Sequence, residues 1–188
     1  MSPVLKYFGL DNVRVMIFVD GENLSIRCGS MLKTGKFILR PGTQYRPDIY
    51  AWSSILTGNG VVEQGAIIRT YYYTAVQGDF PLVGEVLTEL KQIGIGAPRV
   101  FKKAKGTRSK RVDITLATDM LLHATRKNYD IAVLVAGDED YVPLVSAVQS
   151  EGRGVHVWSL PDGLSPALKE AADEHVDLTS LLLSPSDA

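Results

Sequence analysis

Two stretches of this sequence carry carboxylates directly after a short apolar run. Val15–Val19 leads into Asp20-Gly21-Glu22-Asn23, and Val133–Ala136 leads through a glycine into Asp138-Glu139-Asp140. Ligand sites in open α/β sheets lie at the carboxyl ends of the strands, where such side chains leave the sheet. Two strands of this kind, side by side, can share a divalent cation. We therefore expect Asp20 and Asp138 to form two walls of one acidic site.

Asp113 is the third candidate for this site. A helix predicted from about Arg111 places Asp113 on the same stripe as the apolar residues Ala117 and Leu121. A charge on an apolar stripe is costly unless it is paired, bound to a metal or close enough to the helix end to reach a polar cleft. A position in the first turn meets the last condition. Asp119, by contrast, falls about 200° from Ala117 around the same helix, which predicts that it faces the other way.

Aspartates from separate elements suit one or two hard cations. Mg²⁺ and Mn²⁺ prefer carboxylate and water oxygens, keep several waters and need few protein carboxylates. Two such ions activate an attacking water and stabilise the leaving oxygen during displacement at phosphorus. The three histidines and the single cysteine show no spacing typical of a softer metal.

Each acid, taken alone, also fits a structural explanation. Asp20 with Gly21 is typical of a turn or a helix N-cap, and Asp138 could cap a helix that begins near Tyr141. Asp113 could complement the dipole of its own helix. The joint occurrence is harder to explain in this way, because acids clustered at adjacent strand ends repel one another. A cation is the natural neutraliser.

Composition and length indicate one globular domain over residues 1–183, with an elaborated helical or loop region over 28–63 and a disordered tail over 184–188. The 188 residues are 45% hydrophobic and 22% charged, with a formal net charge of −1, so attraction to nucleic acid requires a local basic patch. The lone Cys28 excludes an internal disulfide and fits a reducing compartment. No leader-like segment or apolar run long enough to cross a membrane occurs, so we predict a cytoplasmic protein without membrane contact.

Strand and helix patterns alternate along almost the whole chain. Strands are predicted over Val13–Val19, Gly65–Thr74, Pro98–Phe101, Ile131–Ala136 and Gly154–Ser159. Helices are predicted over residues 21–33, Asp48–Leu56, Phe80–Ile93, Arg111–Arg126, Tyr141–Ser150 and Ser165–Ala172, with a loop over 34–47. This alternation is typical of an α/β protein whose parallel sheet is covered on both faces.

Three blocks of this sequence resemble the signature blocks of the NYN domain family, which belongs to the PIN-like nucleases. They are Phe18–Leu24, Arg111–Met120 and Ala136–Val145, and their order and spacing match as well. The resemblance extends over about Val13–Leu178, and its last part resembles the closing segment of the family. It implies a three-layer, Rossmann-like sandwich with a parallel sheet in the order 3-2-1-4-5. It also implies a Mg²⁺ or Mn²⁺ site at the carboxyl edge of that sheet and cleavage of RNA phosphodiester bonds.

The resemblance implies roles for individual residues. Asp20, Asp113 and Asp138 match the metal-binding acids, Asn23 matches the polar partner beside the first acid, and Asp140 matches a second acid of the third block. Asp119 also matches a family position, and we interpret it as structural or as a supporting residue. Two departures are Arg111, where a glycine often stands, and Glu139 within the third block. Neither removes an acid.

A basic segment immediately precedes Asp113. Residues 102–111 contain six cations and no acid: Lys102, Lys103, Lys105, Arg108, Lys110 and Arg111. These side chains could hold a polyanionic backbone against the acidic centre, or they could form a solvated loop. Their position beside Asp113 favours substrate binding. The run Tyr71-Tyr72-Tyr73 is more typical of packing than of base stacking, and His123 is predicted to be a surface residue.

The sequence thus predicts a metal-dependent ribonuclease that acts on single-stranded RNA. One alternative is a non-catalytic regulatory or partner-binding protein that retains the acidic site. A second is a small-molecule phosphohydrolase with an aspartate nucleophile, which is disfavoured because Asp-Gly-Glu lacks a second aspartate two residues after Asp20. A homodimer is compatible with the size of the chain, although no residue requires one.

Overall fold

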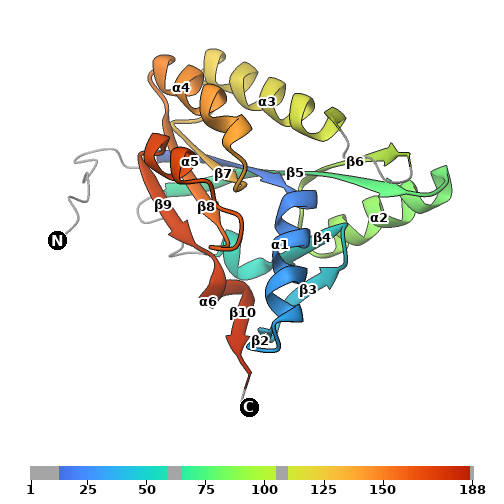
Figure 1. Ribbon diagram of the computed structural model, residues 1–188. Helices are drawn as coiled ribbons and strands as arrows, with labels where there is room; N and C mark the ends of the chain where they lie inside the picture. The colour runs from blue at the N-terminus through green and yellow to red at the C-terminus, as the bar shows by residue number, and fades with distance from the viewer. Residues whose placement is uncertain (1–12, 59–64, 105–109, 187–188) are drawn as a thin grey trace.

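A six-stranded parallel sheet forms the centre of the protein (Figure 1). The computed structural model describes residues 13–58, 65–104 and 110–186. The strands of the central sheet are β1 (Val13–Asp20), β5 (Gly65–Gln77), β6 (Ala97–Lys103), β7 (Ile131–Val135), β8 (Gly154–Ser159) and β9 (Glu174–Asp177). The helices are α1 (Gly21–Lys33), α2 (Phe80–Gln92), α3 (Lys110–Thr125), α4 (Val142–Ser150), α5 (Pro166–Ala171) and α6 (Thr179–Leu182), with short 3₁₀ turns η1 (Ser54–Thr57) and η2 (Glu139–Tyr141).

The strand order is β6-β5-β1-β7-β8-β9, and every neighbouring pair is parallel. Counted along the chain within this sheet, the first five strands follow the order 3-2-1-4-5, so the predicted fold class is confirmed. The order reverses between β1 and β7, which is where ligands bind in sheets of this type. The sixth strand, β9, was not predicted. Its four residues lie at an edge and pair only with β8, so they carry no long apolar run that would mark them.

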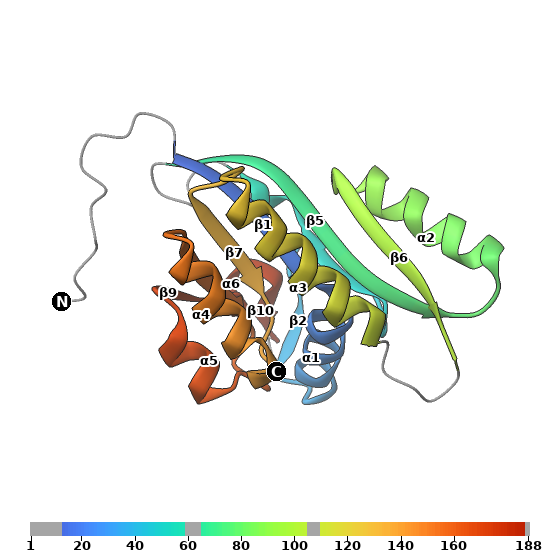
Figure 2. The ribbon, with the colours of Figure 1, turned by 90° about the horizontal axis from the view of Figure 1, so that it is seen from above.

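Side-chain alternation along β1 explains the layers. Val15, Ile17 and Val19 are buried against the layer that contains α1 and α2, whereas Met16 and Phe18 are buried against the layer of α3, α4 and α5. Both faces of a central parallel strand are covered in this way, so its sequence is apolar at nearly every position. Figure 2 shows α3 and α4 crossing over one face of the sheet.

The region between α1 and β5 forms short strands where a loop over 34–47 and a helix over Asp48–Leu56 were predicted. β3 (Thr43–Arg46) and β4 (Tyr50–Ser53) form an antiparallel hairpin, so the predicted helix over Asp48–Leu56 is wrong. Ile49 donates its backbone N–H to the Arg46 carbonyl, with Asp48 at a φ of 59°. Pro47 followed by a residue of positive φ is typical of a tight turn, and the same proline in sequence also resembles a helix entry.

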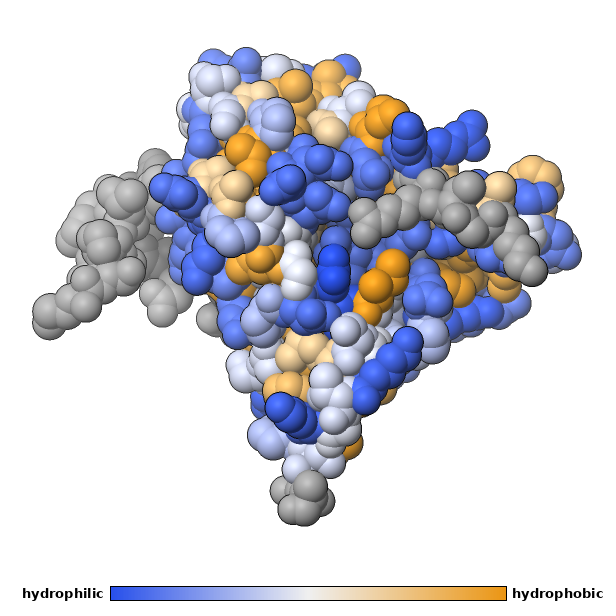
Figure 3. Space-filling model, in the orientation of Figure 1, coloured by the Kyte–Doolittle hydropathy of each residue, from blue (hydrophilic) through white to orange (hydrophobic). Residues whose placement is uncertain are grey.

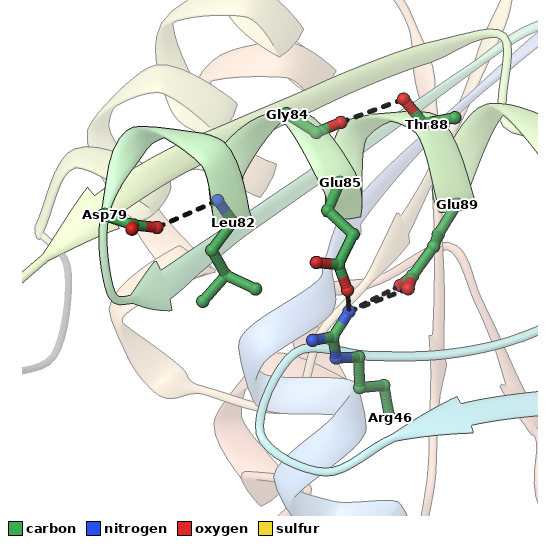
Figure 4. Close-up of polar contacts among 7 residues, drawn as sticks. All are labelled: Arg46, Asp79, Leu82, Gly84, Glu85, Thr88 and Glu89. Atoms are coloured by element: carbon green, nitrogen blue, oxygen red, sulfur yellow. Dashed lines mark hydrogen bonds and ion pairs between the residues drawn. The ribbon is translucent and has the colours of Figure 1, made fainter.

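A salt-bridge network ties this hairpin to α2 (Figure 4). One guanidinium nitrogen of Arg46 lies 2.9 Å from Glu85 and 2.8 Å from Glu89, which stand one turn apart on α2. These charges are partly exposed, so the network orients the hairpin more than it stabilises it.

The chain after Leu178 packs back onto the hairpin side of the molecule. β10 (Leu183–Pro185) pairs with β2 (Phe37–Leu39), so the prediction of a disordered tail is wrong for Ser184 and Pro185. Residues 187 and 188 lie outside the described residues, as do 59–64 of the region predicted to be elaborated. No helix within the described ranges is long and apolar enough to cross a membrane.

Candidate active site

Asp20 ends β1 and also caps α1. Alternate side chains of a strand point to the same face of the sheet, so Asp20 points to the α3 side, as Met16 and Phe18 do. Its Oδ1 accepts a hydrogen bond of 3.0 Å from the backbone N–H of Asn23. Only 5% of the residue is exposed. The sequence offered a capping role and a site role for this aspartate, and its geometry is compatible with both.

Close packing at two glycines fixes the two carboxylate-bearing turns. A Cβ atom at Gly21 would collide with the ring of Tyr72, which is fully buried. A Cβ atom at Gly137 would lie 2.6 Å from the backbone oxygen of Gly163. Glycine at these two positions therefore lets the chain pass close to Tyr72 and Gly163, beside the carboxylates of Asp20 and Asp138.

Tyr141 connects two of the predicted acids. Its hydroxyl lies 3.1 Å from Oδ2 of Asp20 and 3.3 Å from Oδ1 of Asp113. These distances bring a strand end and the first turn of α3 to one point, as the sequence predicted for Asp20 and Asp113. The hydroxyl has one proton, so it can donate to only one of the two carboxylates at a time.

Burial dominates the electrostatics of Asp20. Desolvation, opposed by the hydrogen bond from Asn23 and reinforced by the nearby charge of Asp113, raises the pKa of Asp20 to about 7. Glu22 adds to the same repulsion. The pKa of the buried Tyr141 hydroxyl is raised well above its usual range, chiefly by burial and then by the two aspartates, so it remains a neutral donor.

A single pocket of about 470 Å³ collects the predicted acids. We call it the acidic pocket, and it is lined by Asp20, Glu22, Asn23, Ile26, Lys110, Asp113, Ile114, Ala117, Asp138, Asp140, Tyr141 and Leu144. In the orientation of Figure 1, the space-filling view shows a hollowed, largely hydrophilic surface near the start of α1 (Figure 3). Apolar side chains from α1, α3 and α4 form part of the wall and strengthen the electrostatic interactions within.

Asp138 and Asp140 belong to the turn that follows β7. Oδ1 of Asp138 accepts a hydrogen bond of 3.2 Å from the backbone N–H of Asp140, which makes Asp138 the cap of η2 rather than of α4. Asp138 is half-buried and Asp140 is exposed. Both line the acidic pocket, together with Asn23. The pocket therefore contains all five residues that the sequence proposed as catalytic.

The basic residues divide between two places. Lys110 lines the acidic pocket. The ammonium group of Lys103 lies 2.6 Å from a carboxylate oxygen of Glu22 in a largely buried ion pair. Lys102 and Arg111 lie on an adjoining surface. Lys105 and Arg108, also predicted to bind substrate, lie outside the described residues.

Glu22 and Tyr141 are site residues to which the sequence interpretation gave no role. Both stand within the quoted blocks, but glutamate in a first helical turn is ordinary. The relevant signal for Tyr141 is that a buried tyrosine needs a hydrogen-bond partner for its hydroxyl. Only the fold reveals that the partners are Asp20 and Asp113.

Asp119 and His123 do not line the acidic pocket. Asp119 accepts a 2.9 Å hydrogen bond from Tyr73, so it faces β5 rather than solvent. His123 lies 2.9 Å from the hydroxyl of Tyr71 and packs against its ring, so the predicted surface histidine is half-buried. Tyr71, Tyr72 and Tyr73 are all buried, which confirms packing as their role.

The donor chemistry of the acidic pocket fits a hard divalent cation. Its polar lining comprises five carboxylates, the Asn23 amide, the Tyr141 hydroxyl and the Lys110 ammonium group, so all but Lys110 offer hard oxygen atoms. The pKa of the buried Asp20 carboxylate is raised to about 7, so a nearby cation would stabilise its charged form. Among the described residues, however, no three His, Cys, Asp or Glu side chains meet as a ready-made metal cluster. Magnesium retains several waters and needs few direct protein ligands, so the two observations are compatible.

Removing the Tyr141 hydroxyl is expected to weaken metal binding. In Tyr141→Phe, Asp20 and Asp113 lose their shared donor, and supporting partners of metal ligands typically contribute about 10- to 100-fold in affinity. We expect the dissociation constant for Mn²⁺ to rise by about tenfold. A calorimetric titration with Mn²⁺ measures this change. An unchanged titration curve would contradict the supporting role of Tyr141.

Comparison with known proteins agrees with the resemblance in the three sequence blocks. The NYN domain model matches residues 14–181. A crystal structure of a protein of unknown function from Vibrio parahaemolyticus aligns with a TM-score of 0.67 at 18% identity, covering 94% of this chain and 99% of that one. At this identity the likeness supports the fold alone. The comparison with curated proteins gives no match. Because the family model spans most of the sequence, this chain belongs to the NYN domain family, a family of PIN-like nucleases.

Proposed function

We propose that the protein is a divalent-metal-dependent ribonuclease that hydrolyses RNA phosphodiester bonds in the acidic pocket. The observation that carries this proposal is the meeting of Asp20, Asn23, Asp113, Asp138 and Asp140 around one pocket. These residues come from the end of β1, the starts of α1 and α3, and the turn after β7. Membership in a nuclease family supports the same conclusion.

Asp20, Asp113 and Asp138 would hold Mg²⁺ or Mn²⁺ in this pocket. A bound ion of this kind supplies activation of water and stabilisation of the leaving oxygen. Asp140 and Asn23 would orient the attacking water from the rim. The Tyr141 hydroxyl keeps Asp20 and Asp113 directed towards each other.

The basic residues would counter the repulsion between an acidic pocket and a polyanion. Lys110 stands within the pocket wall, close in sequence to Asp113. Lys102 and Arg111 extend positive charge along the adjoining surface. Lys103 neutralises Glu22 across 2.6 Å and so removes one acid from the approach of the RNA backbone. Phosphate contacts of this type are sequence-independent.

Metal removal tests the proposed function. We expect the purified protein to cleave single-stranded RNA when Mg²⁺ or Mn²⁺ is present and to stop when EDTA is added, with activity restored by excess Mn²⁺. Gel electrophoresis of an end-labelled oligonucleotide measures the products. A protein that binds RNA in Mn²⁺ but never cleaves it would instead favour a regulatory module, and cleavage that persists in EDTA would contradict the metal requirement.

A further inference from the structure

A second hollow adjoins the acidic pocket at the start of α2 and the end of β6. We call it the basic groove. It has a volume of about 440 Å³ and is lined by Phe80, Val83, Val100, Phe101, Lys102, Lys103, Ala104 and Arg111. These described lining residues include no carboxylate, and Lys103 among the three cations is paired with Glu22, so Lys102 and Arg111 supply the positive charge that favours an anion.

Phe80 is an exposed aromatic ring at the rim of this groove. It is 76% exposed, and it is the only aromatic residue among the large, exposed apolar side chains of the described ranges. The helix start beneath it is well fixed, because Asp79 accepts a 3.1 Å hydrogen bond from the backbone N–H of Leu82 (Figure 4). A single exposed apolar residue is common on protein surfaces, so exposure alone assigns no role to Phe80.

The positive charges around Phe80 support a binding role that its exposure alone does not establish. The ammonium group of Lys102 lies 5.2 Å from the centroid of the Phe80 ring. Arg111 lines the same groove. An aromatic face beside cations is how proteins bind single-stranded nucleic acid, with a base stacked on the ring and the backbone held by the charges.

The basic groove and the acidic pocket are joined by residues that pair or stand next to each other. Lys103 lines the groove, yet its ammonium group pairs with Glu22, which lines the pocket. At the start of α3, Lys110 lines the pocket and its neighbour Arg111 lines the groove. The two hollows are therefore neighbours, and a strand whose scissile phosphate lies in the pocket could extend into the groove.

We propose that the basic groove binds a nucleotide of single-stranded RNA that flanks the scissile phosphate. Its base stacks on Phe80, and its phosphate contacts Lys102 and Arg111. This assignment rests on the proposed function and adds an aromatic subsite to it. Stacking of this kind tolerates any base, so the groove contributes affinity and a preference for single strands rather than sequence recognition.

Binding of two probes tests the stacking directly. We would measure the fluorescence anisotropy of a labelled oligouridylate and of a matching abasic phosphate chain, in the Asp20→Asn background with Mg²⁺ present. Phe80→Ala should weaken oligouridylate binding by roughly tenfold and leave the abasic chain unaffected, while Phe80→Trp should restore binding. Lys102→Ala should weaken both probes and reduce the salt dependence by about 0.7 in the log–log slope.

Two matched variants serve as controls. Leu122→Ala truncates an exposed apolar residue of α3, and Lys91→Ala removes an exposed lysine of α2; neither residue lines the pocket or the groove. Both should bind like the parent protein. Equal loss of the two probes in Phe80→Ala, no loss, or no oligouridylate binding at all would overturn the stacking assignment. Cleavage by the wild-type protein is assayed separately, so the proposed function can stand or fail independently of this result.

Discussion

Asp20→Asn is expected to lower RNA cleavage by about a thousandfold, equivalent to about 4 kcal/mol of transition-state stabilisation. The substitution removes the charge that would hold the cation but keeps the size of the side chain. Asparagine caps helices as well as aspartate does, so α1 should still begin at residue 21. Single-turnover cleavage in saturating Mn²⁺ measures the effect.

Asp177→Asn is the matched control. Asp177 also ends a strand of the central sheet and accepts a 2.8 Å hydrogen bond from the backbone N–H of Thr179, but it does not line the acidic pocket. Its asparagine variant should cleave at the wild-type rate. Full activity in Asp20→Asn, or equal loss in both variants, would show that the charge of Asp20 has no special role.

The second large effect is on the stability of the metal-free protein. Burial raises the pKa of Asp20 from 3.8 to about 7, so the folded protein retains a proton that the unfolded chain releases. This contribution to stability is fully present below the unfolded pKa and is lost as pH rises through about 7. The loss amounts to about 4 kcal/mol at most, since each pKa unit corresponds to about 1.4 kcal/mol.

Urea unfolding across this pH range, in the presence of EDTA, measures that loss. The Asp20→Asn variant should show no such loss of stability with rising pH, and it should be more stable than the wild type above pH 7. Mn²⁺ should restore stability to the wild type but not to the variant, because a ligand that binds only the folded state stabilises it. If the stability of both proteins changed with pH in the same way, burial of the Asp20 charge would not be the cause of the loss.

Asp130 provides a control of opposite sign. The hydrogen bond from Arg14 lowers the pKa of this carboxyl. Its contribution is therefore present above the ordinary aspartate pKa and is lost as pH falls through the lowered value. Asp130→Asn should therefore lower stability at neutral pH and remove the loss of stability on the acidic side, whereas Asp20→Asn should remove the loss that occurs as pH rises towards 7.

The sheet and the acids at its edge could be predicted because their signals are local. Val15–Val19 and Val133–Ala136 are apolar at nearly every position, as strands buried on both faces must be. Once such strands are parallel neighbours, the residues that follow them meet at one edge. Asp113 does line the acidic pocket, but the apolar-stripe reasoning that placed it there was wrong. The buried stripe of α3 is Val112, Leu116, Met120 and Ala124, and Asp113 is exposed beside it, so its place in the first turn brings it to the pocket.

The missed features depend on contacts between distant parts of the chain. Ala51 and Trp52 were predicted to lie in a helix. Instead, the Trp52 ring packs edge-on against Tyr72, and the Tyr72 hydroxyl forms hydrogen bonds with the backbone of Ala51. The bridge from Tyr141 to Asp20 spans 121 residues. The outward direction predicted for Asp119 failed for a similar reason, since Tyr73 of β5 supplies a partner that helical periodicity does not reveal.

The location of Mn²⁺ in a crystal soaked with the metal tests the central claim most directly. Anomalous scattering identifies the ion without any assumption about activity. We expect a peak in the acidic pocket within coordination distance of the Asp20 and Asp113 carboxylates, absent from crystals of Asp20→Asn. A crystal of cleavage-competent protein whose manganese lies only elsewhere would contradict the assignment of this pocket as the metal site.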